Sequence, residues 1–277
     1  MLWTLFLLLK AKKRKGGKVL DSIFKHTENN GEAIITGLQR ALTETSIFIP
    51  ETINGIPVVE IGPEAFRSTS ITDIKIGENI KKIGEKAFYM CEKLQSVTWH
   101  CQCDVIPADC FFGCSNLMQF DFSDIKKVDR AAFYESGLKE VCLPENIEVV
   151  SEWAFFECKK LSSVIWNCKC NVIPVDCFAR CSDLTQFDFS NIKRIEVRAF
   201  RDSGLTSVTL NEETEVGECC FSNCNDLEKI EWLSGQAIKD SIFAGCKNIK
   251  EIFISDRVMD IAVDAFSSSP NAEISFI

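Results

Sequence analysis

Histidine, tyrosine and glycine-rich loops are scarce in this 277-residue chain. It has two histidines, His26 and His100, and neither lies in a recognisable nucleophile arrangement. No glycine-rich phosphate loop follows a candidate strand. The two tyrosines contrast with 21 phenylalanines, as expected where aromatic rings are buried without a polar tip. These features argue against an enzyme, and we predict no catalytic residue and no cofactor.

Basic charge is short outside the N-terminus. The net charge is −9, but residues 1–18 hold six basic residues and no acidic one, so the remainder carries −9 − 6 = −15. A body this acidic repels phosphate, and no Lys/Arg stripe recurs along it. We therefore expect no nucleic acid partner, and a protein ligand that is neutral or basic. The same charge would equally serve solubility.

A bilayer-length apolar run is missing as well. The N-terminal MLWTLFLLL is nine residues long, whereas a spanning helix takes about 20. Secretory signals place their charge before the apolar run, and here KAKKRKGGK follows it. Three interpretations stay open: the end of a truncated membrane segment, a misassigned start, or a nuclear-import cluster at Lys12–Lys15. We expect residues 1–19 to lie outside the fold.

What the sequence does contain is a Phe that returns about every 22 residues. Self-similarity at such a short period indicates one supersecondary unit stacked on copies of itself. No Pro/Gly/Ser linker interrupts the series, so we predict a single solenoid over residues 20–277. The ten recurring phenylalanines are Phe66, Phe88, Phe111, Phe133, Phe155, Phe178, Phe200, Phe221, Phe243 and Phe266.

One period shows how a repeat would fold. Leu138, Val141 and Leu143 follow L-x-x-L-x-L, which places the last two on one face of a strand. Pro144 ends that strand because it lacks the N–H of a further ladder bond. The Ala154–Phe155 pair and its neighbours are expected to form a short helical or 3₁₀ turn that returns the chain to the next strand. Repetition of this unit predicts about eleven short strands.

These residues resemble the BspA-type leucine-rich repeat. The resemblance rests on IGENIKKIGEKAFYMC at residues 76–91 and IPETINGIPVVEIGPEAF at residues 49–66. It implies an α/β solenoid with a parallel β-sheet face and about ten repeats, each of roughly 22 residues. Because parallel crossovers are right-handed, we predict a right-handed superhelix. Residues 20–60 would form an N-terminal cap, and residues 61–277 the repeats. The family also implies binding roles, commonly adhesion at cell surfaces, but no one ligand.

The repeats also follow a longer period of three repeats. Residues 88–154 and 155–221 are near-copies, which indicates duplication of a three-repeat block. The strand-closing positions include three tryptophans, which we interpret as core rather than as a cofactor box. Asp121 and Asp188 match across the copies, but three strand spacings are roughly 14 Å, beyond the separation used in two-carboxylate hydrolysis.

Fifteen cysteines would suggest disulfides if the chain were short. Six of them, however, stand three residues after the repeat Phe, where a free Cys packs as a small hydrophobe. Reduced cysteines favour a cytoplasmic location, with the cell surface or a membrane-associated site as the alternative. The six are Cys91, Cys114, Cys158, Cys181, Cys224 and Cys246.

One cysteine pattern would suit a zinc site. C-x-C-x₆-C-x₃-C supplies four thiolates, but three of the four align with core positions of neighbouring repeats. Only Cys101 and Cys168 are left unexplained, and we predict no metal. The pattern comprises Cys101, Cys103, Cys110 and Cys114, and recurs as Cys168, Cys170, Cys177 and Cys181.

Strand residues between the inward ones point outward and form the candidate binding surface. Two apolar members, Ile165 and Phe253, favour contact with a partner over a merely solvated face. The candidate residues are Ser96, Thr98, Gln119, Asp121, Ser163, Ile165, Gln186, Asp188, Ser207, Thr209 and Phe253.

Three functions remain for such a chain. The first is a non-enzymatic scaffold that binds proteins on its strand face, and the second a cell-surface adhesion or recognition protein. The third is a purely structural spacer. Because the chain ends at ISFI without a polar capping segment, that end would be covered by a partner or would associate end to end with a second copy.

Overall fold

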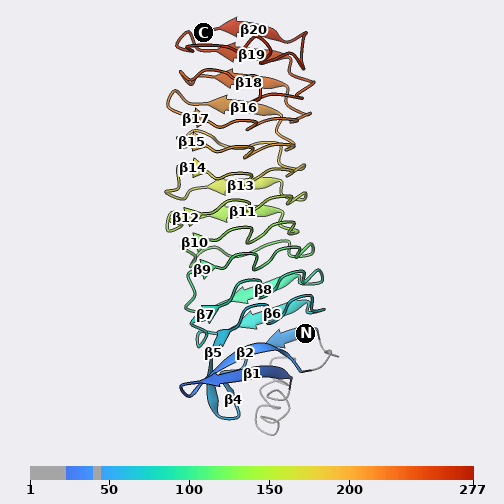
Figure 1. The fold of residues 1–277 in the computed structure, drawn as a ribbon, viewed down its shortest axis with the longest axis vertical. Helices are drawn as coiled ribbons and strands as arrows, with labels where there is room; N and C mark the ends of the chain where they lie inside the picture. The colour runs from blue at the N-terminus through green and yellow to red at the C-terminus, as the bar shows by residue number, and fades with distance from the viewer. Residues whose placement is uncertain (1–22, 40–44) are drawn as a thin grey trace, which may run out of the picture.

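The computed structural model describes residues 23–39 and 45–277, so the expectation for residues 1–19 lies outside the described residues. The chain winds into a tall stack of coils, with the described N-terminal strands at one end and the C-terminus at the other (Figure 1). Within the described ranges, no helix is long and apolar enough to cross a membrane.

Five strands form the N-terminal end of the stack. β1 (Phe24–Asn29) and β2 (Glu32–Leu38) make an antiparallel hairpin, and β2 pairs in parallel with β5 (Ile56–Ile61). β3 (Ser46–Phe48) joins the main sheet, and β4 (Thr52–Ile53) pairs antiparallel with β5. The ring of Phe24 lies edge-on to Phe66, with centroids 6.3 Å apart, and so covers the first repeat ring.

The longer strands stack in parallel on one side of the coil and form the expected strand face (Figure 1). In most of these strands buried residues alternate with outward ones, as in Glu140, Val141, Cys142 and Leu143. The last strand differs, because all four of its residues are exposed. After β3 these strands are β6 (Asp73–Ile76), β8 (Ser96–Trp99), β11 (Glu140–Leu143), β13 (Ser163–Trp166), β16 (Ser207–Leu210), β18 (Lys229–Trp232), β19 (Glu251–Ile254) and β20 (Glu273–Phe276).

The strand face is interrupted twice, which corrects the prediction of about eleven strands. Residues 119–122 and 186–189 occupy strand positions but form no ladder with their neighbours, so nine of the eleven positions are strands in the described chain. The two interruptions lie at equivalent places in the near-copies 88–154 and 155–221 and therefore belong to the duplicated block.

Two local features explain each interruption. The inward position holds Phe120, whereas other strands carry Val or Ile there, and its ring packs against Phe111 and Phe133 at 5.5 and 5.2 Å. A ring of this size holds the backbone away from both neighbours. In addition, Asp121 Oδ1 accepts the amide of Ser123 at 3.0 Å, a local bond that competes with the sheet ladder. Asp188 holds the amide of Ser190 at 2.9 Å in the same way.

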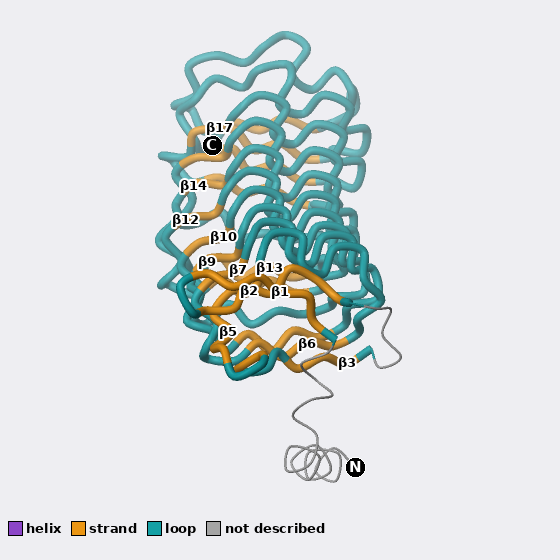
Figure 2. The backbone as a smooth tube through the Cα atoms, turned by 60° about the horizontal axis from the view of Figure 1, so that its bottom comes forward, coloured by secondary structure: helices purple, strands orange, loops and turns teal. Residues whose placement is uncertain are grey.

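A second parallel sheet of two-residue strands lies along another side of the coil (Figure 2). The sequence analysis did not predict it. Its members after β5 are β7 (Lys82–Ile83), β9 (Val105–Ile106), β10 (Lys127–Val128), β12 (Val149–Val150), β14 (Val172–Ile173), β15 (Arg194–Ile195) and β17 (Glu215–Val216).

The second sheet breaks before β9 and before β14, and proline is the reason. In other coils the residue after the short strand donates its amide to the preceding coil, as Asp129 does to the Ile106 oxygen at 3.0 Å. Pro107 and Pro174 take this position in the two broken coils and have no N–H to donate.

The turns around the repeat phenylalanines are not helical, which corrects the expected helical or 3₁₀ turns. No α- or 3₁₀-helix occurs in residues 23–39 and 45–277. The residues two before and two after Phe155, Trp153 and Glu157, have φ of +59° and +57°, which right-handed helices exclude. Alternate turn amides bond to the next coil, as Phe133 does to the Ala154 oxygen at 2.9 Å. The amides between them bond three residues back within the turn, as Tyr134 does to the Ala131 oxygen at 3.1 Å.

The core is the predicted column of phenylalanines. Consecutive rings from Phe66 to Phe266 stack in near-parallel planes at centroid distances of 5.2 to 5.8 Å. Trp99, Trp166 and Trp232 are buried beside them, which confirms that they are core residues.

The six cysteines after the repeat phenylalanines are buried, as predicted, and each also links two coils. The thiol donates to the carbonyl oxygen of the preceding repeat Phe, for example from Cys91 to Phe66 at 2.9 Å and from Cys246 to Phe221 at 3.0 Å. The sequence showed the packing role but not this hydrogen bond. All fifteen cysteines are free thiols.

Candidate functional site on the strand face

The predicted binding residues all lie on the strand side of the coil, but not all in strands. Most are exposed, and Thr98 and Phe253 are half-buried. Those within strands are Ser96, Thr98, Ser163, Ile165, Ser207, Thr209 and Phe253, and those within the interruptions are Gln119, Asp121, Gln186 and Asp188.

Several of the polar side chains bond to one another across the strands. Ser96 Oγ donates to Asp73 Oδ1 at 2.6 Å, and Thr209 Oγ1 donates to Glu231 Oε2 at 3.1 Å. Lys229 forms a 2.7 Å ion pair with Glu231, which lowers the pKa of that carboxyl and raises the pKa of the lysine. At β18 the face is therefore charged, and its lysine and glutamate are paired with each other.

The two apolar residues differ in accessibility. Ile165 is 47% exposed, as expected for a contact residue. Phe253 is half-buried, with Lys229 Nζ 5.1 Å from its ring centroid, so the expectation of an exposed Phe253 is wrong. The lysine ammonium lies over the ring because a cation is attracted to the aromatic face.

A shallow hollow of about 240 Å³ opens at the first interruption, lined by Ser96, Val97, Gln119, Phe120 and Asp121. Within the described ranges, no backbone hydrogen bond joins residues 119–122 to β8 or β11. The Ser123 hydroxyl and amide bonds lower the pKa of Asp121, so it is ionised at neutral pH. The hollow thus places an aromatic edge beside an amide and a carboxylate.

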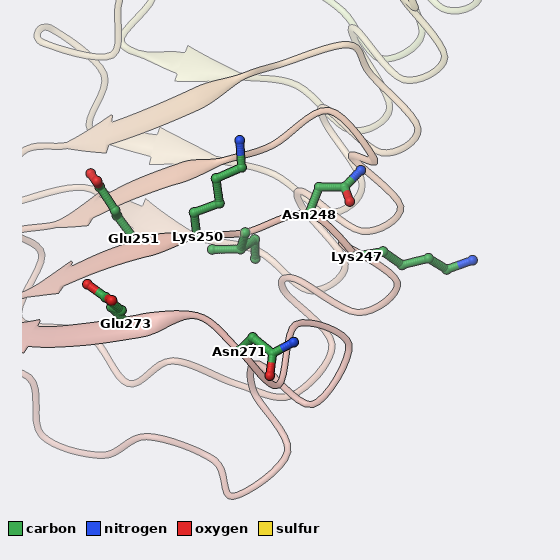
Figure 3. A pocket seen from close by; sticks show the side chains of 7 residues that line it. Lys247, Asn248, Lys250, Glu251, Asn271 and Glu273 are labelled. Carbon is green, nitrogen blue, oxygen red and sulfur yellow. The ribbon is translucent and has the colours of Figure 1, made fainter.

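A second hollow, of about 410 Å³, lies between β19 and β20 near the C-terminal end (Figure 3). Glu251 and Glu273 project from adjacent strands at paired positions, and Lys247 points away from them. Lys250 is paired with Glu228 at 2.7 Å. The described polar groups around this hollow therefore do not converge on one point.

A column of half-buried rings on the turn side was missed by the sequence analysis. Tyr89, Phe112, Tyr134 and Phe156 stack at centroid distances of 4.4 to 4.7 Å. An arginine lies over the ring at each end of this column. The Arg67 guanidinium carbon is 5.0 Å from the Tyr89 ring centroid, and the Arg180 guanidinium carbon is 5.7 Å from the Phe156 ring centroid. The available signal was an aromatic residue directly after the repeat Phe in four successive repeats.

The cysteine pattern does not gather into one cluster. Cys103, Cys110 and Cys114 are buried in core positions as predicted, and Cys101 is half-buried. In the part of the chain that the structure describes, no group of three or more His, Cys, Asp or Glu side chains is placed to hold a metal ion.

Parallel coils of one repeat each, a stacked Phe core and an outward strand face define a leucine-rich-repeat solenoid. The sequence model of the BspA type Leucine rich repeat region (6 copies) matches residues 42–162, 106–228 and 171–277, and the chain belongs to this family. A comparison with curated proteins finds no match.

Solved structures share the fold at low sequence identity. A leucine-rich repeat protein from Bacteroides ovatus is 22% identical with a TM-score of 0.69, covering 90% of this chain and 79% of that chain. A leucine rich cell surface protein from Faecalibacterium prausnitzii is 21% identical with a TM-score of 0.51, covering 92% and 93%. The pneumococcal vaccine antigen PcpA is 12% identical with a TM-score of 0.52, covering 91% of each chain.

Proposed function

We propose that this chain is a non-enzymatic scaffold that binds a neutral or basic protein through its strand face. The observation that carries the proposal is the outward row of Ser and Thr side chains on β8, β13 and β16, beside which the apolar Ile165 is 47% exposed. At about 4.8 Å per strand and 3.3 Å per residue, the whole strand face is about 50 Å long and 13 Å wide. This is comparable to the roughly 800 Å² per partner of a standard interface.

The hollow beside Phe120 supports the same surface. Its backbone groups are not used by the sheet, and Gln119 and Asp121 line it. An extended segment of a partner would find both hydrogen-bonding groups and an aromatic edge there. A basic residue of the partner would meet the ionised Asp121 or Asp188.

A capture experiment from the native cell type tests the scaffold function. The first variant combines Gln119→Arg, Gln186→Arg and Thr209→Arg, which adds charge and bulk to the face without touching the core. The matched control combines Gln102→Arg, Asn225→Arg and Ser267→Arg, three exposed positions outside the strand face. We expect the first variant to lose its partners and the control to keep them. Unchanged partners for a folded first variant would exclude the strand face.

Cell-surface recognition is the alternative function, favoured by family membership. Surface labelling of intact cells with a membrane-impermeant reagent separates the two. Labelling of the exposed lysines would support the surface function, and protection until lysis would support the intracellular scaffold. A spacer that binds nothing would give no partner in the capture experiment, whatever its location.

The C-terminal strand is a second proposed contact surface, for end-to-end self-association. β20 is the edge strand of its sheet, with Ile274 48% and Phe276 63% exposed, and such edges readily pair with another chain. Sedimentation of the wild type and of Ile274→Lys tests this, because a charge on an edge strand blocks pairing. We also infer that the coil is right-handed, following the general rule for parallel crossovers.

A further inference from the structure

Three loops share one construction, in which a buried tryptophan holds the backbone four residues later. The indole Nε1 of Trp99 donates to the Cys103 carbonyl oxygen at 3.0 Å, and Trp166 donates to that of Cys170 at 2.6 Å. The third loop repeats the contact from Trp232 to Gln236 at 3.2 Å. The indole bond therefore fixes the loop shape in all three.

The loops differ in the side chains they carry. The first has Cys101 and Cys103, and the second has Cys168 and Cys170. The third has Ser234 at the position of Cys101, and Ser234 Oγ donates to the Thr214 oxygen at 2.8 Å. Because the third loop keeps its shape without cysteine, the loop itself does not need the two thiols.

In the second pair the Cys168 thiol reaches over to the Cys170 carbonyl oxygen at 3.8 Å, so its sulfur lies beside residue 170. In both pairs the partner cysteine is the largest influence on the pKa of each thiol. Residues two apart on an extended strand are separated by about 6.6 Å, but the chain bends at residues 101–102 and 168–169 and draws each pair together. Disulfides form between residues with Cα separations up to about 6.8 Å. The pairs therefore need little backbone movement to close.

The paired thiols are also more accessible and more loosely held than the other core cysteines. Cys101, Cys168 and Cys170 are half-buried, whereas Cys91 is fully buried and bonds to its carbonyl at 2.9 Å. Cys103 and Cys170 lie 3.6 and 3.7 Å from their carbonyl acceptors, so little is lost when these contacts break. The neighbouring Cys103 side chain lowers the pKa of Cys101, and the Cys168 side chain lowers the pKa of Cys170. A lowered pKa favours the thiolate, which is the attacking species.

We propose that Cys101–Cys103 and Cys168–Cys170 are two reversible dithiol–disulfide sites that exchange with small-molecule disulfides of the glutathione type. One thiolate attacks a sulfur of the small disulfide, which breaks that S–S bond and releases one small thiol. The neighbouring thiol loses its proton and attacks the protein sulfur of the mixed disulfide, which releases the second small thiol. The protein pair is oxidised by two electrons, and the small disulfide is reduced to two thiols.

The full chain is equilibrated in mixtures of reduced and oxidised glutathione, quenched with acid, alkylated and analysed by peptide mass spectrometry. We expect both members of each pair to lose alkylation together, with a loss of two hydrogens and no glutathione adduct. The other eleven of the fifteen cysteines should behave differently. Cys142, which is exposed, and Cys219, which is half-buried, should carry at most a glutathione adduct. The nine buried cysteines should stay reduced while the fold is intact.

Two variants complete the test. Cys101→Ser copies the residue that the third loop carries naturally, so the fold should survive, which far-ultraviolet circular dichroism would verify. Disulfide formation should then be lost at the first loop and unchanged at the second, and Cys168→Ser should show the reverse. If the wild-type pairs remain reduced across oxidising mixtures, or form only separate adducts, the proposal is wrong. Dithiothreitol must restore the alkylation, because an irreversible product would also contradict it.

Discussion

The thiol of Cys158 donates a hydrogen bond to the carbonyl oxygen of Phe133, 3.1 Å away in the preceding coil. Burial raises the pKa of this thiol to about 12, so it stays protonated and remains a donor at any physiological pH. Cysteine at this position therefore joins neighbouring coils as well as filling space between them.

Removal of that donor should destabilise the protein measurably. Cys158→Ala leaves the Phe133 carbonyl without this partner and a small void beside it, and we expect a loss of about 1–3 kcal/mol in the free energy of unfolding. Cys158→Ser keeps a donor and should cost less. Urea melts followed by circular dichroism would measure both, and equal losses would show that the hydrogen bond contributes nothing.

Substitutions in the core and on the strand face should separate clearly. Phe155→Ala removes a ring that stacks between Phe133 and Phe178, and should cost about 3–5 kcal/mol in the free energy of unfolding. Thr98→Ala lies on the outward side of β8 and should change stability by about 0.5 kcal/mol or less. A comparable loss for both variants in denaturant melts would contradict the register described above.

Asp176 is the one buried carboxylate among the residues that the structure describes. It is 5% exposed, accepts the Trp153 indole N–H at 3.0 Å and binds Arg198 through two nitrogens. Asp176→Ala should cost about 1–3 kcal/mol, because both donors lose a buried acceptor. Asp176→Asn keeps one acceptor oxygen and tolerates the positive φ of this residue, so it should cost less. An exposed acid, Asp226, provides the control through Asp226→Ala.

Acid should destabilise the fold gradually. Five carboxyl groups have lowered pKa values. Lysine side chains are the chief cause at three of them: Lys126 at Asp104, Lys159 at Glu157 and Lys229 at Glu231. Hydrogen bonds from the Ser123 hydroxyl and the Ser190 amide are the chief cause at Asp121 and Asp188. Unfolded carboxyls titrate near pH 4. Their contribution to stability is thus complete above about pH 5 and is lost as the pH falls through the folded pKa values.

Urea melts between pH 7 and pH 3 would follow this loss. Asp121 and Asp188 are exposed, and Asp104, Glu157 and Glu231 are half-buried. Solvent therefore screens all five groups, and the individual effects are small. Asp121→Asn should flatten the acid slope slightly and leave stability at pH 7 nearly unchanged. An acid slope independent of all five carboxylates would contradict the assignment.

The sequence was sufficient to predict the core because a single residue type recurs in a single position. Phe155 and Cys158 lie where the repeat register places them. The continuity of the sheets was not predictable from the period, since it depends on single departures from it. Phe120 breaks one sheet by its volume and Pro107 breaks the other by its missing amide. The break at Pro107 could have been predicted from the sequence if a second sheet had been expected. The break at Phe120 could not, because it depends on how the ring packs.

The interruptions of the two sheets never fall between the same two coils. Where β7 and β9 are unpaired, β6 and β8 are paired, and where residues 119–122 leave the strand face open, β9, β10 and β12 are continuous. The same alternation returns at β12–β14 and at residues 186–189. Each pair of neighbouring coils in the described repeats therefore keeps at least one of the two parallel ladders, and no plane across the stack lacks both. When the stack is pulled along its axis, we expect no single pair of coils to separate first, because every pair is held by backbone hydrogen bonds. The force would then be shared by all the coils.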